Sequence, residues 1–288
     1  RIHIIDSELI DNEGQHGVAL SLYESWALIE GTDLLRNVST EEGGAVYAEM
    51  SQLDFRGCRI DSNESSYVGG GIYIEDHSSI VMTNCSVSGN SVGSQPGEGG
   101  GAYIGQYSRA TFFKTLMVGN SAVGSGKAVS AYDARVQLTN CTVVDNAGEF
   151  AALYVYAESE YFGPLFGNPH YLTITNTILR NAADEISTGG VADSVLVRYS
   201  NIQGGRPGEG NIDVDPLFVN TEIGDYHLLP GTPCVDAGDP TSPRDLDQSR
   251  ADMGAYGSSI PEDALAGVLE TTTLTKAASP HRVWGLVV

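Results

Sequence analysis

Apolar residues recur in three columns around a fourth column of Ser, Thr and Cys along the first 205 residues of the chain, and the spacing of these columns predicts a solenoid. Each of Cys58, Cys85 and Cys141 is preceded by apolar residues three and five positions earlier and is followed by another two positions later. The pattern extends in both directions, and the anchor column reads Ser7, Thr32, Cys58, Cys85, Thr115, Cys141, Thr177 and Ser200. Successive anchors are 25, 26, 27, 30, 26, 36 and 23 residues apart, which is typical of a repeat architecture.

The periodicity within each repeat indicates strands. Apolar residues fall at every second position, whereas a helix would place them at a period of about 3.6. The repeats are also rich in Gly, Ser, Asn and Thr, which disfavour helices and form turns. One repeat accommodates three short strands and three bends, so we expect a parallel β-helix of about eight coils over residues 1–205. Coils about 4.8 Å apart would build a rod roughly 40 Å long.

An asparagine follows the anchor by five residues in six successive repeats. Asparagine tolerates left-handed backbone at a bend and can hydrogen-bond to its copies on neighbouring coils. We therefore expect a structural asparagine ladder, without a catalytic role, along one corner of the solenoid. Its members are Asn12, Asn37, Asn63, Asn90, Asn120 and Asn146.

Glycine pairs in three repeats precede a strand that carries a tyrosine. Glycine permits a sharp bend at a place where a Cβ atom would clash. The tyrosines are Tyr47, Tyr73 and Tyr103, and they are expected to line up along one face. Two interpretations are open: a stacking ladder that stabilises the sheet, or an aromatic platform for sugar rings.

Three of the four cysteines occupy the anchor column, which elsewhere holds Ser or Thr. We therefore interpret them as small core residues with reduced thiols. Cys58 and Cys85 lie on adjacent coils and are near enough to be linked. Cys85 and Cys141 are separated by the Thr115 coil, which puts them about 9–10 Å apart and too far to bridge.

The repeat of 36 residues between Cys141 and Thr177 contains an insertion, residues 158–171. It is rich in aromatic residues in a chain that has few, and loops on a rigid scaffold commonly carry binding sites. The candidate ligand-binding residues are Tyr161, Phe162, Phe166, His170 and Tyr171. The alternative is a flap that packs on the sheet.

The period stops after Gly205. Residues 206–257 are expected to form a C-terminal capping module, because an open solenoid end exposes strand edges and core. Within it, Asp236, Asp239, Asp245 and Asp247 are candidate calcium ligands, since closely spaced oxygen ligands suit that ion. They can equally be turn formers. Residues 258–288 form a strand-prone tail, expected to lie on its own solenoid or on a neighbour's edge.

Charge narrows the classes of partner. The chain has 37 acidic and 15 basic residues, a formal net charge of -22, which disfavours nucleic acids and anionic membrane surfaces. No stretch approaches the roughly 18 apolar residues of a membrane-spanning helix. The arginines are scattered among the repeats, and no two carboxylates form a recognisable hydrolase pair. We assign no catalytic residue.

Two segments resemble known families. Gly43-Gly44-Ala45-Val46 and Leu34-Leu35-Arg36-Asn37 resemble the repeats of bacterial polymorphic outer-membrane proteins, with aliphatic residues in place of their phenylalanine. Residues 199–205 and Asp252-Met253-Gly254-Ala255-Tyr256 are similar to the C-terminal end of bacterial right-handed β-helix repeat proteins, within the pectate-lyase-like superfamily. The resemblance implies a right-handed β-helix and export to the bacterial surface or medium.

The favoured function is an extracellular structural protein, either a surface adhesin or a fibre-forming subunit. The first coil begins at Ile2 without a preceding cap, so we expect end-to-end self-association through this coil and the C-terminal tail. One alternative is a calcium-dependent polysaccharide lyase or hydrolase. The resemblance implies an arginine or lysine base for a lyase, and such a base needs a lowered pKa. The other alternative is a carbohydrate-binding protein without catalysis.

Overall fold

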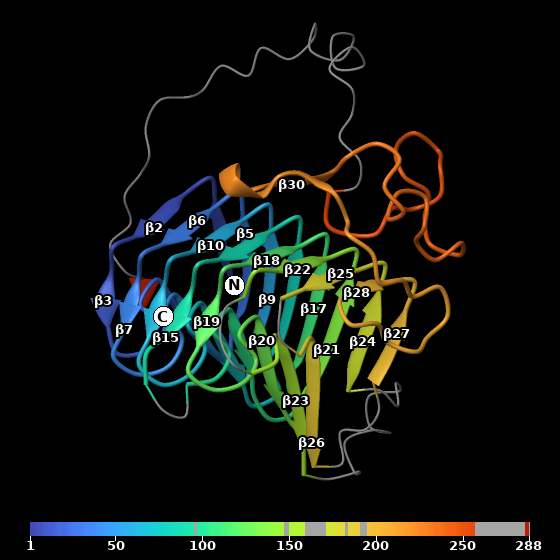
Figure 1. Ribbon diagram of the computed structural model, residues 1–288. Helices are drawn as coiled ribbons and strands as arrows, with labels where there is room; N and C mark the ends of the chain where they lie inside the picture. Colours follow the sequence, from blue (N-terminus) through green and yellow to red (C-terminus); the bar gives the residue numbers. More distant parts are fainter. Residues whose placement is uncertain are drawn as a thin grey trace, which may run out of the picture.

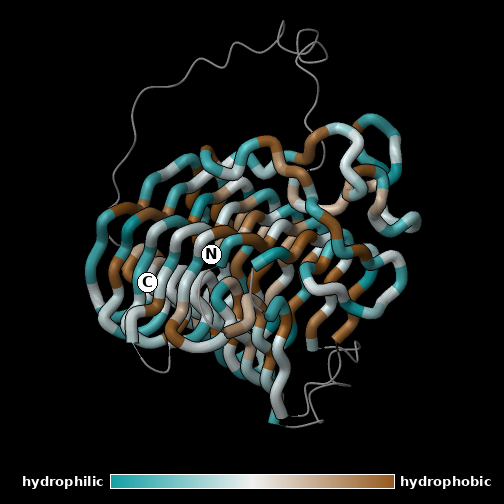
Figure 2. Tube along the Cα trace, in the orientation of Figure 1, coloured by the Kyte–Doolittle hydropathy of each residue, from teal (hydrophilic) through white to brown (hydrophobic). Residues whose placement is uncertain are grey.

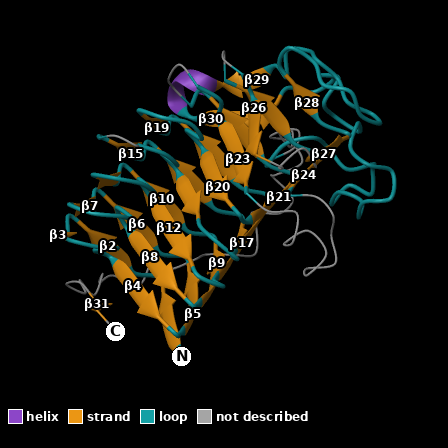
Figure 3. Ribbon diagram, turned by 90° about the horizontal axis from the view of Figure 1, so that it is seen from below, coloured by secondary structure: helices purple, strands orange, loops and turns teal. Residues whose placement is uncertain are grey.

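The protein is an all-β parallel solenoid. The computed structural model describes residues 1–94, 97–146, 150–158, 171–181, 184–190, 195–256 and 286–287. Figure 1 shows the chain winding through stacked coils from the N-terminus, and Figure 3 shows the strands of successive coils in parallel rows. Three of its walls contain eight strands each, and the solenoid makes about seven turns, so the predicted fold class is confirmed.

Two walls of the solenoid meet at the anchor column. Sheet A contains, in stacking order, β1 (Ile2–Ile5), β5 (Trp26–Glu30), β9 (Gln52–Arg56), β13 (Ser79–Thr83), β17 (Arg109–Phe113), β21 (Arg135–Thr139), β24 (Leu172–Thr175) and β27 (Val195–Arg198). Sheet B contains β2 (Glu8–Ile10), β6 (Asp33–Leu35), β10 (Arg59–Asp61), β14 (Ser86–Ser88), β18 (Leu116–Val118), β22 (Thr142–Val144), β25 (Ile178–Arg180) and β28 (Asn201–Ile202).

The coil is completed by a short wall and a long one. Sheet C contains β3 (Glu13–Gly14), β7 (Val38–Ser39), β11 (Glu64–Ser65), β15 (Ser91–Val92) and β19 (Ser121–Ala122). Sheet D contains β31 (Leu286–Val287), β4 (Leu20–Tyr23), β8 (Val46–Glu49), β12 (Ile72–Glu75), β16 (Ala102–Ile104), β20 (Val129–Tyr132), β23 (Leu153–Ala157) and β26 (Ile186–Gly190). The tail strand β31 pairs in parallel with β4, so these two tail residues lie on their own solenoid.

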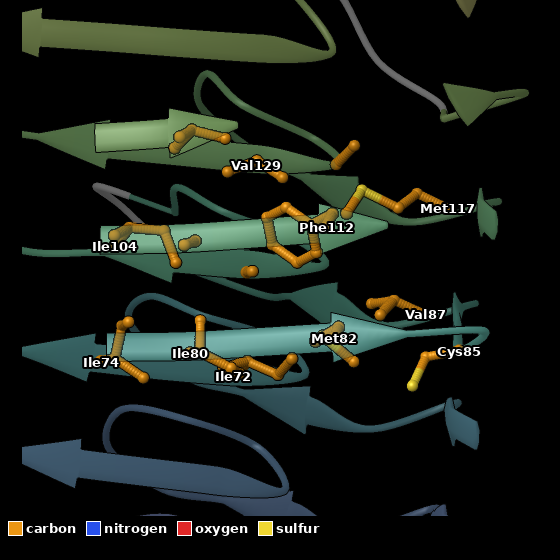
Figure 4. Packing of buried hydrophobic residues seen from close by; sticks show 14 of the residues in the cluster. Ile72, Ile74, Ile80, Met82, Cys85, Val87, Ile104, Phe112, Met117 and Val129 are labelled. Atoms are coloured by element: carbon orange, nitrogen blue, oxygen red, sulfur yellow. The ribbon is translucent and has the colours of Figure 1, made fainter. Parts of the chain in front are cut away.

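The predicted apolar columns form the core. Phe55, Met82 and Phe112 are register partners in sheet A, and each is fully buried. Figure 4 shows Met82 and Phe112 on their successive coils among the other buried residues. The outer faces are mostly polar, and Figure 2 shows hydrophobic and hydrophilic stretches recurring in successive coils. Strand alternation therefore sorts the residues between core and solvent, as the period of two predicts.

The asparagine ladder is confirmed. The Oδ1 atom of Asn63 accepts hydrogen bonds from both the backbone N–H and the Nδ2 of Asn37, each at 2.9 Å. The same pair of bonds links Asn63 to Asn90 and Asn90 to Asn120. Each side-chain amide within the ladder donates one hydrogen bond to the next asparagine, toward the C-terminal end of the stack, and a second one back to a carbonyl of the preceding coil, as Asn63 does to Leu34.

The expected left-handed bend lies one residue earlier than predicted. The residues with positive φ immediately precede the ladder asparagines: Asp11, Arg36, Ser62, Gly89, Gly119 and Asp145. Each asparagine side chain within the ladder uses its acceptor for the preceding asparagine and its two donors for the next asparagine and for a carbonyl of the preceding coil, as Asn63 does. The bend is therefore made by the neighbour, and this part of the prediction is wrong.

The ladder has a seventh member and ends on a carboxylate. Asn181, which follows its anchor by four residues and not five, accepts both bonds from Asn146. Its own N–H and Nδ2 donate to the two carboxylate oxygens of Glu185, each at 2.6 Å. Glu185 is 6% exposed, and its burial raises the pKa of the carboxyl. A carboxylate accepts hydrogen bonds without donating, so it can satisfy the donors that the last asparagine directs toward the C-terminal end of the stack.

The C-terminal module continues the stack only briefly. Residues 209–212 pair with the last coil, where the Ile212 N–H donates to the Ser200 carbonyl at 2.9 Å. Residues 217–256, which include β29 (Phe218–Asn220), the 3-10 helix Thr221–Ile223 and β30 (Asp225–Leu228), lie alongside sheet B (Figure 1). A second apolar cluster forms there from Leu116, Val144 and Ile178 of the sheet and Tyr226, Leu228, Cys234 and Met253 of the module. Most of the module therefore lies beside the stack and not across its end.

Candidate functional site

The outer face of sheet D carries a column of stacked tyrosines. Tyr47, Tyr73 and Tyr103 are register partners on β8, β12 and β16. Their ring centroids are 5.1 and 5.4 Å apart, with interplanar angles of 8° and 6°. At this separation two nearly parallel rings overlap in an offset stack. Because the rings cover one another's faces, the column is a stacking ladder, and flat docking of a sugar is restricted to its ends.

Each of the first two tyrosines is tied to a glutamate on the same face. The Tyr47 hydroxyl donates to Glu49, and the Tyr73 hydroxyl donates to Glu75 two residues further along the strand. Burial, followed by the bond to the carboxylate, raises the pKa of both tyrosines, so their hydroxyls stay protonated donors at neutral pH. We call Tyr47, Glu49, Tyr73, Glu75 and Tyr103 the tyrosine–glutamate face.

The tyrosine column is interrupted one coil beyond Tyr103. The register partner there is Ser130, and Tyr154 follows on the next coil. The Ser130 hydroxyl donates to the Glu98 carboxylate at 2.9 Å. Burial raises the pKa of Glu98, and its charge raises the pKa of both Tyr103 and Tyr154, which puts the carboxylate near both rings. Burial beside Ser130 therefore favours the protonated form of the Glu98 carboxyl.

Sequence reasoning missed Glu98. The available signal was the serine in a column of tyrosines, which indicates that some other side chain occupies the position of the missing ring.

The predicted binding loop is only partly described. Tyr161, Phe162, Phe166 and His170 lie outside the described residues. Tyr171 is 4% exposed and belongs to the main apolar core. Its ring therefore has little surface to offer a ligand.

The buried aspartate of the predicted calcium set, Asp239, is used within a turn. Its Oδ1 accepts bonds from the backbone N–H and the hydroxyl of Thr241, at 2.8 and 2.6 Å. These bonds, with the hydroxyl contributing most, lower the pKa of the Asp239 carboxyl. Arg198 approaches its other oxygen at 3.6 Å.

The other three aspartates also make local contacts. Asp247 accepts the N–H of Ser249, Asp245 accepts the N–H of Asp252, and the N–H of Asp236 donates to the Asp252 carboxylate. Among the described residues, no three His, Cys, Asp or Glu side chains come together as a metal-binding group. The contacts of these aspartates are those of turns, and calcium binding stays a prediction.

Two arginines that look scattered in the sequence are neighbours in the structure. Arg109 and Arg135 are register partners on β17 and β21. Burial and, to a smaller extent, the charge of Arg109 lower the pKa of Arg135. A lowered pKa is what the lyase alternative requires of a base. This pair lies on sheet A, one wall away from the tyrosine–glutamate face.

A cavity of about 360 Å³ lies where the described coils end. It is lined by Asp184, Glu185, Ile186, Ile202, Gln203, Gly204, Gly205 and Arg206. Its buried carboxylate, Glu185, is already bonded to the end of the asparagine ladder. The cavity therefore lies over the last described coil of the core.

One comparison with known proteins, with a family model, agrees with this architecture. A family model described as a right handed beta helix region matches residues 2–113. A crystal structure of the pectate lyase Pel9A is similar, with 14% identity and a TM-score of 0.46, covering 85% of this chain and 70% of that one. A comparison with curated proteins gave no match. None of the described helices is long and apolar enough to cross a membrane.

The fold and the family model define the class of protein. The chain is a right-handed parallel β-helix repeat protein. The resemblance of its repeats to those of polymorphic outer-membrane proteins stays a prediction.

Proposed function

We propose that the protein is an extracellular structural protein of bacterial origin, a surface adhesin or fibre-forming subunit built as a rigid rod. The observation that carries this proposal is that its repeating polar side chains contact the next coil. The asparagine amides bond to one another, anchor-column hydroxyls and thiols accept the preceding anchor's N–H, and the tyrosine rings stack. These contacts join coil to coil, which is the requirement for a rod that bears load.

The last described coil supports end-to-end self-association. Among the described residues, β26 and β27 each have one neighbour in their sheets. Thr188 of β26 is exposed, although its register partner Val155 is buried in the core. An unpaired strand edge beside an open inward-facing position can accept another coil. The partner we propose is a second copy of this chain.

Charge sets a condition for this association. The formal net charge of -22 makes two copies repel each other in dilute salt. Screening at about 0.15 M ionic strength shortens the range of that repulsion to about 8 Å. Association should therefore strengthen with salt, unlike the binding of a cationic partner to the same acidic surface.

The test compares two matched threonine variants of the full chain. Thr188→Arg places a long cation at the open inward-facing position, and Thr40→Arg makes the same change at an exposed residue beside sheet C. We expect concentration-dependent assemblies of the wild type and of Thr40→Arg in analytical ultracentrifugation and electron microscopy, and monomers of Thr188→Arg. A wild type that stays monomeric at high concentration and moderate salt would exclude the fibre-forming role.

A carbohydrate-binding role without catalysis is the second candidate. The tyrosine–glutamate face favours it, because a phenol and a carboxylate lie side by side on each of two successive coils and can bond to sugar hydroxyls. An uncharged glycan fits the acidic surface better than a polyanion. The same purified proteins, screened against uncharged and uronate glycans with and without calcium, separate binding from cleavage: retention without new reducing or unsaturated ends supports binding.

A further inference from the structure

The anchor column brings two thiols together inside the solenoid. Cys58 and Cys85 occupy equivalent positions on adjacent coils, immediately before β10 and β14, which pair in parallel. The backbone N–H of Cys58 donates to the Cys85 Sγ at 3.4 Å. Both residues are 2% exposed. Adjacent parallel strands lie about 4.8 Å apart, which falls within the Cα separations of about 4.4–6.8 Å found in disulfides.

The two thiols are chemically unequal. Each Sγ contacts a backbone carbonyl of the preceding coil, Cys58 with Ile29 at 3.3 Å and Cys85 with Phe55 at 3.6 Å. The hydrogen bond from the Cys85 thiol lowers the pKa of Cys58, while the same contact raises the pKa of Cys85. Cys58 is therefore the thiol that more readily supplies the reactive thiolate.

Cys141 provides an internal contrast. It occupies the same column, but its neighbours there are Thr115 and Thr177, and its N–H donates to the Thr177 hydroxyl at 3.2 Å. Burial raises the pKa of Cys141 to about 12. Cys141 thus shares the local environment of the pair without a partner thiol in its column.

We propose that Cys58 and Cys85 are an oxidisable dithiol that a peroxide converts into a disulfide between the third and fourth coils. The Cys58 thiolate attacks hydrogen peroxide, the O–O bond breaks, and Cys58 sulfenic acid and hydroxide form. The Cys85 thiol then attacks the Cys58 sulfur, which forms the S–S bond and releases water. Two thiols are oxidised and one peroxide is reduced, so no other reactant is required.

The disulfide would strengthen the joint between two coils. It would close a loop of 26 residues between Cys58 and Cys85, and a link of this kind restricts the unfolded chain. The reduced column already tolerates Ser and Thr at equivalent positions, so the thiol pair is not needed for the fold itself. The inference is independent of the adhesin and fibre roles proposed above.

The test counts free thiols in the full-length protein. Reduced protein is treated with hydrogen peroxide, and in parallel it is refolded from urea with oxidised and reduced glutathione, which reaches thiols before the coils close. Alkylation under denaturing conditions and peptide mass analysis then identify the linked residues. We expect two of the four thiols to be lost to a Cys58–Cys85 link and Tm to rise by about 5–10 °C, reversed by dithiothreitol.

Serine variants separate this outcome from unspecific oxidation. Cys58→Ser and Cys85→Ser reproduce residues already found in the column and should abolish both the link and the rise in Tm. Cys141→Ser should leave both unchanged. Four free thiols after both treatments, or a link that involves Cys141 or Cys234, would overturn the proposal.

Discussion

The solenoid and the C-terminal module hold together in different ways. In residues 1–205 each coil repeats the contacts of its neighbour, so one rule, such as the bond from Asn37 to Asn63, accounts for many hydrogen bonds. In residues 217–256 every contact is made once. The module depends on a small apolar cluster with sheet B and on individual bonds such as that from Asn140 Nδ2 to the Asp252 carbonyl at 2.9 Å.

The difference predicts how each region loses its structure. In a repeat protein stability is the sum of the coils and the interfaces between them, so a defect in a central coil weakens its neighbours as well. A module attached by single contacts can detach while the coils below it stay folded. Variants that remove one asparagine from each kind of contact therefore distinguish the two regions.

The largest effect is expected at the middle of the ladder. Asn90→Ala removes the acceptor for the N–H and Nδ2 of Asn63 and the donor to the Ile60 carbonyl, all of them buried. Buried polar groups without partners cost about 1–3 kcal/mol each, so we expect unfolding free energy to fall by about 3–5 kcal/mol. Urea unfolding followed by circular dichroism measures the change.

The first ladder residue is the matched control. Asn12 is partly exposed and donates to Asn37 without accepting from an earlier asparagine in the described chain. Asn12→Ala should cost only about 1 kcal/mol, because water can solvate the groups left behind. Equal losses for Asn12→Ala and Asn90→Ala would contradict a ladder whose strength depends on burial.

A smaller and more local effect is expected where the module attaches. Asn176 Nδ2 donates to Ser242 at 3.0 Å, and its Oδ1 accepts the Asp239 N–H at 2.6 Å. Asn176→Ala should weaken this attachment by about 2 kcal/mol. Hydrogen exchange should then rise in peptides of residues 217–256 and stay constant in the coils.

Asn84 separates lost contacts from backbone strain. Asn84 immediately precedes the anchor Cys85, which makes it the equivalent of Asn176 three coils earlier. Its φ is 53°, against 52° for Asn176, so alanine is equally strained at both positions. Faster exchange of the module in Asn84→Ala would contradict the role of the Asn176 side chain.

The solenoid could be predicted because its signal is repeated. The periodicity predicted the apolar column three residues before the anchors, which contains Phe55, Met82 and Phe112, and it also predicted six ladder asparagines. Asn181 was missed because it follows its anchor by four residues, and Glu185 because it ends the pattern. A period identifies what recurs, and it carries no information about where the recurrence stops.

One overlooked feature of the sequence indicates where the module lies. The first residue of the sheet B strands faces outward, and it is polar in early coils, at Asp33 and Arg59, but apolar at Leu116 and Ile178 in later ones. Such a change indicates that another part of the chain covers the sheet. The contacts of the aspartates had no comparable signal, because the same spacing suits a turn and a calcium site.

The smallest effect is expected within the solenoid itself, where Ser130 interrupts the tyrosine column of sheet D. Burial raises the pKa of Glu98 above its ordinary value of 4.5, so the folded state holds this proton more tightly than the unfolded state. The resulting stability is fully present below about pH 4.5 and is lost as the pH rises through the folded pKa. Glu98→Gln removes this dependence, so its Tm relative to wild type should be higher at pH 7.5 than at pH 4.5.

Partial exposure of Glu98 keeps the change small, about 2 °C in Tm. Ser130→Ala refines the test, because the bond from Ser130 at 2.9 Å opposes the effect of burial on the pKa. Its loss should raise the Glu98 pKa further and move the pH-dependent window upward. Parallel Tm curves for all three proteins from pH 4.5 to 7.5 would show that Glu98 is solvated like a surface carboxylate. The interruption would then be an open, solvated gap between two rings.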